Sequence, residues 1–193
     1  MELLVIAGAN GAGKTTFAEK YADKYLQSKE FINIDLMAKG ISPLNYKNVF
    51  IEAGKLAFKR INQLLSKKSD FSFETTLSGK GYIKLFKRIK NNGYKINIVY
   101  LYIPDVNFAV KRVRERVKHG GHSVDDTDIR RRFYRSIHNL FNLYWNILDD
   151  IEIIDNSSFI PKIIAVRRDG NLNIIDDLKF NQMKRWSEYE EKI

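Results

Sequence analysis

Cysteine is absent from the 193 residues of this sequence, and histidine occurs only three times. Without cysteine, the protein cannot form disulfide bonds, thiolate-ligated zinc sites or a catalytic thiol, and it suits a reducing compartment. No apolar run approaches the length of a membrane span, and no basic leader precedes the first one. We therefore expect a cytoplasmic protein without a membrane partner.

Acidic residues are also scarce relative to basic ones. The chain has 33 Lys and Arg against 23 Asp and Glu, a net charge of +10. Such a charge favours acidic partners, which include nucleotides, phosphorylated metabolites, nucleic acid and acidic proteins, and does not choose among them. The hydrophobic share of 44% is ordinary for one globular domain, so we treat residues 1–193 as a single domain.

A phosphate-binding loop is the strongest motif. Residues 8–15 satisfy G-x-x-x-x-G-K-[ST] at every fixed position, between an apolar run and a helical pattern. Backbone N–H groups and the positive end of the helix can then hold a polyphosphate. Lys14 is expected to reach the β- and γ-phosphates, and Thr15 to ligate Mg²⁺. The predicted nucleotide-binding residues here are Gly8, Ala9, Asn10, Gly11, Ala12, Gly13, Lys14, Thr15 and Thr16.

Strand and helix patterns alternate through most of the chain. Strands are expected at 3–7, 31–34, 71–73, 96–103 and 151–154, and helices at 14–25, 48–66, 79–92, 106–117 and 126–148. Gly40 and Pro43 indicate a connector over 36–45, and Asp169-Gly170 predicts a hairpin before a polar helix at 178–191. The prediction is a P-loop NTPase three-layer α/β sandwich with a mainly parallel five-stranded sheet, a helical lid at about 105–135 and a C-terminal β-hairpin.

Three polar signatures fall at the carboxyl ends of predicted strands, where ligands bind in such sheets. Besides the loop, these are Asp35 and Glu74. Asp35 is placed to take the proton from an acceptor hydroxyl, although a helix cap before Leu36 is an equal alternative from position alone. Glu74 is interpreted as a group that organises Mg²⁺ or binds the acceptor, against the alternative of a simple turn. Asn156 follows the fifth strand, where a purine base is expected.

Two basic helical patterns flank His119-Gly120-Gly121-His122. Arginines from a closing lid stabilise the negative charge that develops during phosphoryl transfer. Most of these side chains are expected to form a solvated surface, with two or three functional ones. The two histidines lack further ligands at metal-binding spacing, so we interpret them as lid residues.

Taken together, the phosphate loop, Asn33-Ile34-Asp35, Phe73 to Gly79, the Arg112–Val117 and Gly120–His122 segments, Arg131-Arg132-Phe133 and Asp155-Asn156-Ser157 occur in one order. Over about residues 2–170 this order resembles the zeta-toxin-like P-loop kinases, in particular their compact branch of predicted ATPases. That family phosphorylates the 3′-hydroxyl of the sugar in UDP-N-acetylglucosamine and is restrained by an antitoxin protein.

The resemblance implies roles for individual residues. Lys14 and Thr15 would bind ATP and Mg²⁺, and Asp35 would be the base that faces the acceptor. Glu74 and Thr75 would line the acceptor side, and Arg116 and Arg132 would clamp the transferring phosphate. On the same basis, the acceptor site is predicted to include His122 and Arg131.

The sequence thus predicts an ATP- and Mg²⁺-dependent kinase of the zeta-toxin type that acts on a sugar nucleotide such as UDP-N-acetylglucosamine. A polynucleotide or nucleoside kinase, which the basic lid would suit, is one alternative. An ATP-binding switch or ATPase module without an acceptor is another. An antitoxin protein is an expected partner, and nucleic acid is a less favoured one.

Overall fold

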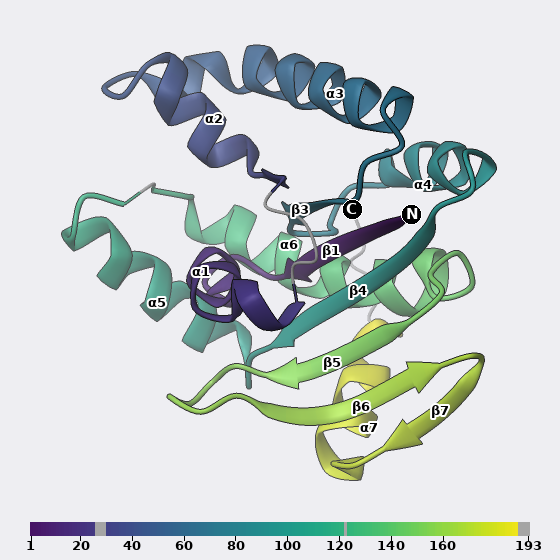
Figure 1. The fold of residues 1–193 in the computed structure, drawn as a ribbon. Helices are drawn as coiled ribbons and strands as arrows, with labels where there is room; N and C mark the ends of the chain where they lie inside the picture. Colours follow the sequence, from purple (N-terminus) through teal and green to yellow (C-terminus); the bar gives the residue numbers. More distant parts are fainter. Residues whose placement is uncertain (26–29, 122, 189–193) are drawn as a thin grey trace.

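The computed structural model describes residues 1–25, 30–121 and 123–188. One seven-stranded sheet with the order β2-β3-β1-β4-β5-β6-β7 forms its middle layer (Figure 1). The strands are β1 (Glu2–Gly8), β2 (Phe31–Ile32), β3 (Phe71–Thr75), β4 (Lys95–Tyr102), β5 (Ile151–Asp155), β6 (Lys162–Arg168) and β7 (Asn171–Ile174). The helices are α1 (Lys14–Tyr25), α2 (Ile34–Ile41), α3 (Phe50–Ser66), α4 (Tyr82–Asn91), α5 (Val106–Lys118), α6 (Asp126–Asn139) and α7 (Asp177–Ser187).

The central strand β1 positions the phosphate loop. Its apolar residues from Val5 to Ala7 are fully buried, as expected for a parallel strand covered on both faces. In the register with β3, Ile6 lies opposite Glu74, and in the register of β2 with β3, Ile32 lies opposite Phe73. Asn33 and Glu74 therefore lie at the same edge of the sheet as the loop that follows β1.

The predicted fold class is confirmed, but the sheet has seven strands rather than five. Strands β2, β3, β1, β4 and β5 are parallel, and β6 then pairs antiparallel with β5, with Ile153 opposite Ala165. The predicted hairpin forms between β6 and β7. It joins the main sheet because Ile164 and Ala165 are buried beside β5.

Helices cover both faces of the sheet (Figure 1). On one face, Tyr25 of α1 donates a hydrogen bond of 2.6 Å to Glu152 of β5. On the other, the buried Tyr100 of β4 lies 2.8 Å from Ser136 of α6, oxygen to oxygen. The α6 and α7 helices pack together on this second face, where Phe133 and Trp186 meet edge to face. This arrangement gives the three predicted layers.

The connector expected at 36–45 is wrong, because most of it is helix α2. Asn33 caps this helix, since its side-chain oxygen accepts a hydrogen bond from the Leu36 N–H at 3.0 Å. The strand before it is correspondingly shorter and ends at Ile32. The helix ends at Ile41, one residue before the Ser42-Pro43 pair, so proline does stop it as predicted, whereas Gly40 does not. With α3, it stands beside the β2–β3 edge of the sheet (Figure 1).

Several other helices differ from their predicted lengths, and α4, for example, covers Tyr82–Asn91 rather than 79–92. The helix expected at 126–148 is regular only to Asn139, and a π-helical turn follows over Leu140–Tyr144. The C-terminal helix α7 ends at Ser187, and the residues predicted beyond 188 lie outside the described part of the chain. Among the described residues, none of the helices combines the length and the apolar character that a membrane span requires.

Candidate active site

The phosphate loop joins β1 to α1 and has the tight backbone that its glycines predict. Gly13 has a φ of +80°, and a Cβ atom there would lie 2.8 Å from the side-chain nitrogen of Asn156. The Ala12 N–H donates to the Ala9 carbonyl at 3.1 Å, which closes the turn. The backbone conformation thus favours glycine at position 13, and a Cβ atom there would also displace the Asn156 amide.

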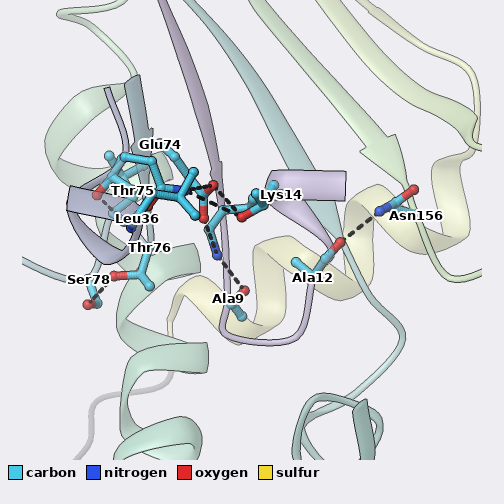
Figure 2. Close-up of polar contacts among 12 residues, drawn as sticks. Ala9, Ala12, Lys14, Leu36, Glu74, Thr75, Thr76, Ser78 and Asn156 are labelled. Atoms are coloured by element: carbon cyan, nitrogen blue, oxygen red, sulfur yellow. Dashed lines mark hydrogen bonds and ion pairs between the residues drawn. The ribbon is translucent and has the colours of Figure 1, made fainter. Parts of the chain in front are cut away.

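Lys14 lies inside this loop and is only 8% exposed. Its Nζ donates to the Ala9 carbonyl at 3.1 Å and lies 3.8 Å from Oε1 of Glu74 (Figure 2). Burial lowers the pKa of Lys14, and the negative charges of Glu74 and Asp35 oppose that shift. A cation held this deep, with one partner at a long distance, is suited to an additional anionic ligand.

Glu74 connects three elements through one carboxylate. Its Oε2 accepts a hydrogen bond from the Thr15 hydroxyl at 2.7 Å and another from the Asn33 amide at 2.8 Å. The side chain is 11% exposed. The carboxylate of β3 therefore links the start of α1 to the start of α2.

A cavity of about 490 Å³ opens beside the loop. It reaches from Lys14, Thr15 and Glu74 at one end to the loop after β5 at the other. The remaining lining residues are Gly11, Gly13, Thr16, Phe17, Lys20, Tyr21, Arg112, Arg116, Asn156, Ser158, Phe159 and Pro161. This volume is within the usual range for small-molecule sites.

Asn156 lies where the sequence predicted, at the end of β5 and next to the phosphate loop. Its side chain donates to the Ala12 carbonyl at 2.7 Å, on the opposite side of the loop from Glu74 (Figure 2). Arg112 of α5 holds the same segment, because its guanidinium donates to the backbone carbonyls of Asn156 and Ser157 at 2.9 and 3.1 Å. The first predicted lid helix is thereby fastened to the loop after β5.

Asp35 is the second residue of α2 and is exposed. The alternative in which Asp35 itself caps a helix is wrong, because Asn33 is the cap. Burial raises the pKa of the Tyr82 phenol, and the negative charge of Asp35 adds to that shift. The same charge opposes the lowering of the Lys14 pKa by burial. Asp35 thus lies near Lys14 but outside the cavity lining.

The predicted lid arginines occupy two different places. Arg116 lines the cavity and is close enough to lower the pKa of Lys14. Arg131 and Arg132, on α6, pair instead with Asp128 of the same helix, at 2.6 and 3.2 Å. The structure therefore brings Arg116 to the phosphate loop and leaves the other two outside the cavity lining. His122 lies outside the described residues.

Thr75 opens a short loop between β3 and α4. Its hydroxyl accepts a hydrogen bond from the Leu77 N–H at 3.0 Å, and Leu77 has a φ of +59°. The buried Asn139 of α6 donates to the Leu77 carbonyl at 2.9 Å and so holds the loop against α6. Thr76 and Ser78 share a further hydrogen bond of 2.8 Å (Figure 2).

Sequence reasoning missed several contributors to this site, among them Asn33 and Phe159. Asn33 carries one part of the Glu74 network, and its signal was a helix-capping residue two positions before an acidic one. Phe159 lines the far end of the cavity, where Lys20 lies 4.3 Å from the centre of its ring. No local sequence pattern indicated Phe159, because its position depends on how the loop after β5 packs against α1.

A comparison with protein families places these residues in context. Residues 2–178 match the family described as zeta toxin. The chain belongs to the zeta toxin family. An uncharacterised protein of Haemophilus influenzae strain Rd is 31% identical over 126 residues, which cover 65% of this chain and 88% of that protein.

Solved structures share the fold of this zeta toxin family member at low sequence identity. The complex of AvrRxo1-ORF1 with AvrRxo1-ORF2 and ATP superposes with a TM-score of 0.77 at 14% identity, covering 100% of this chain and 65% of that one. The PezAT toxin–antitoxin system of Streptococcus pneumoniae gives 0.61 at 18% identity, covering 98% of this chain and 79% of that one. The chain thus spans slightly less than two thirds of the AvrRxo1-ORF1:-ORF2 chain that it matches.

These comparisons confirm the family resemblance and the P-loop kinase fold. Membership of the zeta toxin family supports phosphotransferase activity.

Proposed function

We propose that this protein is an ATP- and Mg²⁺-dependent kinase that transfers the γ-phosphate of ATP to a hydroxyl of a sugar nucleotide such as UDP-N-acetylglucosamine. One observation carries the proposal. The buried Lys14, its partner Glu74 and the lid residue Arg116 line one cavity at the phosphate loop, and Asp35 acts electrostatically on Lys14 from α2. Such a site combines cations for phosphates with a carboxylate for an attacking alcohol.

The nucleotide would occupy the 490 Å³ cavity with its phosphates against the loop. The N–H groups of the loop and the start of α1 favour negative charge there. Lys14, which has lost water by burial, would regain a strong anionic partner. The purine would lie towards Asn156 and Phe159 at the other end of the cavity, where an aromatic ring offers a stacking surface.

The residues at the loop fit a magnesium ion. Thr15 Oγ1 and Glu74 Oε2 are hard oxygen donors 2.7 Å apart, beside the cavity. Among the described residues, no cluster of three His, Cys, Asp or Glu could bind a metal by itself, which agrees with Mg²⁺ bound by one or two protein oxygens and substrate phosphates. When bound, the ion neutralises charge that develops on the phosphates.

The acceptor would approach from α2 and the loop after β3. Asp35 is exposed in the first turn of α2, so its carboxylate is free to accept the proton of an acceptor hydroxyl. Glu74 and Thr75 would line the same side. The hydroxyl oxygen then forms the new bond to the γ-phosphorus as the bond to the β–γ bridging oxygen breaks, and ADP leaves.

The lid would stabilise the phosphoryl group in transfer. Arg116 already lines the cavity, and Arg132 would have to leave Asp128 to reach it. That exchange costs little, because a half-exposed pair four residues apart on a helix contributes only about 0.3–0.5 kcal/mol. Arg131 shares the same aspartate, and we assign it with His122 to the acceptor side.

The choice of acceptor rests on the family and not on a contact in this structure. Zeta toxin membership supports a sugar nucleotide and an antitoxin partner, and the structural neighbours include proteins described as a toxin–antitoxin system. The net charge of +10 also suits a nucleic-acid end, so oligonucleotides belong among the substrates to be tested.

The test is incubation of the wild-type protein and Asp35→Asn with γ-labelled ATP and a panel of sugar nucleotides, nucleosides and oligonucleotides. We expect label on a sugar nucleotide with the wild type, and a rate lower by about 10²–10⁴-fold with Asp35→Asn while ATP binding persists. Asp177→Asn is the matched control, since Asp177 is also exposed in the first turn of a helix. Label on oligonucleotides would instead support a polynucleotide kinase, and label only on free phosphate would support an ATPase.

A further inference from the structure

Asn33 uses both ends of its amide in the site, although it lies outside the cavity lining. The side chain is 5% exposed. Its oxygen accepts the Leu36 N–H at 3.0 Å, and its nitrogen donates to Glu74 Oε2 at 2.8 Å and, more weakly, towards Thr15 Oγ1 at 3.4 Å. One buried side chain therefore joins the first turn of α2 to the carboxylate that holds Thr15.

We propose that Asn33 is a positioning residue that fixes the helix bearing Asp35 relative to the magnesium site. The inference rests on the proposed function and extends it to the relation between the two halves of the reaction. The acceptor side would be placed by α2 and the metal side by Glu74, and the Asn33 amide is the hydrogen-bonded link between them.

The link also orients the Thr15 hydroxyl. Because the Thr15 hydroxyl donates its hydrogen bond to Glu74 Oε2 at 2.7 Å, a lone pair of Thr15 Oγ1 stays available for a cation. The Asn33 amide donates to the same carboxylate oxygen and holds it in place. Partners of this kind around a metal ligand usually change metal affinity or activity by about 10–100-fold when removed.

An amide is required for both contacts at once. Serine at position 33 would keep an oxygen that can cap α2, but its shorter side chain lacks an N–H group to reach Glu74. Alanine would lose the cap and the donor together. Comparison of Asn33→Ser with Asn33→Ala therefore separates the effect of the cap from the effect of the link to Glu74.

The experiment measures binding of a fluorescent ATP analogue to the full chain over a MgCl₂ titration, together with the thermal midpoint. Both variants should need about 10–100-fold more Mg²⁺ for half-maximal binding, with unchanged binding in the absence of Mg²⁺. Asn33→Ala should also lower the thermal midpoint more than Asn33→Ser does, because it alone loses the cap. Asn91→Ser, at an exposed position at the end of α4, should behave as the wild type.

A Mg²⁺ dependence of Asn33→Ser equal to that of the wild type would overturn this inference and leave the proposed function intact. A shift seen with alanine and not with serine would also overturn it, since the effect would then come from the helix cap. If binding of the ATP analogue by the wild type does not depend on Mg²⁺, the proposed function is wrong, and the inference is wrong with it. Wild-type Mg²⁺ dependence without phosphoryl transfer would contradict only the kinase proposal.

Discussion

Replacing Glu74 with glutamine should destabilise the protein, because it removes the nearest counter-charge of the buried Lys14. The two groups lie 3.8 Å apart, and both are close to fully buried. At an effective dielectric constant of about 20, unit charges at that distance attract by about 4 kcal/mol. The variant also avoids the cost of burying the carboxylate, and Asp35 still acts on Lys14, so we expect a net loss of about 2–3 kcal/mol.

The loss should depend on pH in a definite direction. Burial lowers the pKa of Lys14 and Glu74 opposes this, so the pKa should fall further in the variant. The cost of a charged Lys14 is fully present below its folded-state pKa and disappears as the pH rises to the ordinary lysine value of about 10.5. The difference in stability between wild type and Glu74→Gln should therefore be largest at about pH 7 and smaller at about pH 10.

Urea denaturation at several pH values measures this difference, and thermal unfolding should show a midpoint lower by about 4–12 °C at neutral pH. Glu52→Gln, at an exposed position in the first turn of α3, is the matched control and should change stability by less than about 0.5 kcal/mol. A loss for Glu74→Gln that is equally small, or one that stays constant from about pH 7 to about pH 10, would refute the coupling of Lys14 to Glu74.

Three further predictions test other parts of the structure. Gly13→Ala should lower the free energy of unfolding by about 1–2 kcal/mol because of the φ of +80°, and it should displace the Asn156 amide. Asn156→Ala should lose the hydrogen bond to Ala12 without the backbone strain, and urea denaturation and ATP binding compare the two variants. Arg116→Ala should lower the transfer rate by about 10²–10³-fold, and Arg116→Lys should lower it less because lysine keeps the charge. A rate of Arg116→Lys equal to that of the wild type would argue against a planar two-oxygen contact. Tyr100→Phe should lower the free energy of unfolding by about 1–3 kcal/mol, because the buried Ser136 hydroxyl loses its partner. Adding Ser136→Ala should recover part of that loss, and additive losses in a double-mutant cycle would contradict the contact.

Local patterns were sufficient for most of the elements. The phosphate loop, helix α1 and the hairpin were predicted because each depends on residues close together in the chain, such as glycines in a turn or apolar residues at helical spacing. Helix α2 was missed for a local reason as well. The prediction gave Gly40 the weight of a helix stop, while the stronger signal, the capping residue Asn33, was not used.

Local patterns could not determine how many strands join the same sheet. The hairpin of β6 and β7 could have formed a separate unit, and only its pairing with β5 made it part of the main sheet. Similarly, the sequence predicted a cluster of lid arginines without indicating which of them would reach the cavity. Arg116 does, whereas Asp128 holds Arg131 and Arg132 on their own helix.

By itself, the sequence determined the chemistry that is available: a loop that can hold phosphates, carboxylates at strand ends and arginines on two helices. The tertiary structure decided which of these groups meet. Thr15 and Glu74 are 59 residues apart, Asn33 and Glu74 are 41 apart, and the amide of Asn156 reaches Ala12 across 144 residues. Turns and helices form from neighbours in the chain, but contacts at these separations depend on strand order and register, which only the packed sheet fixes.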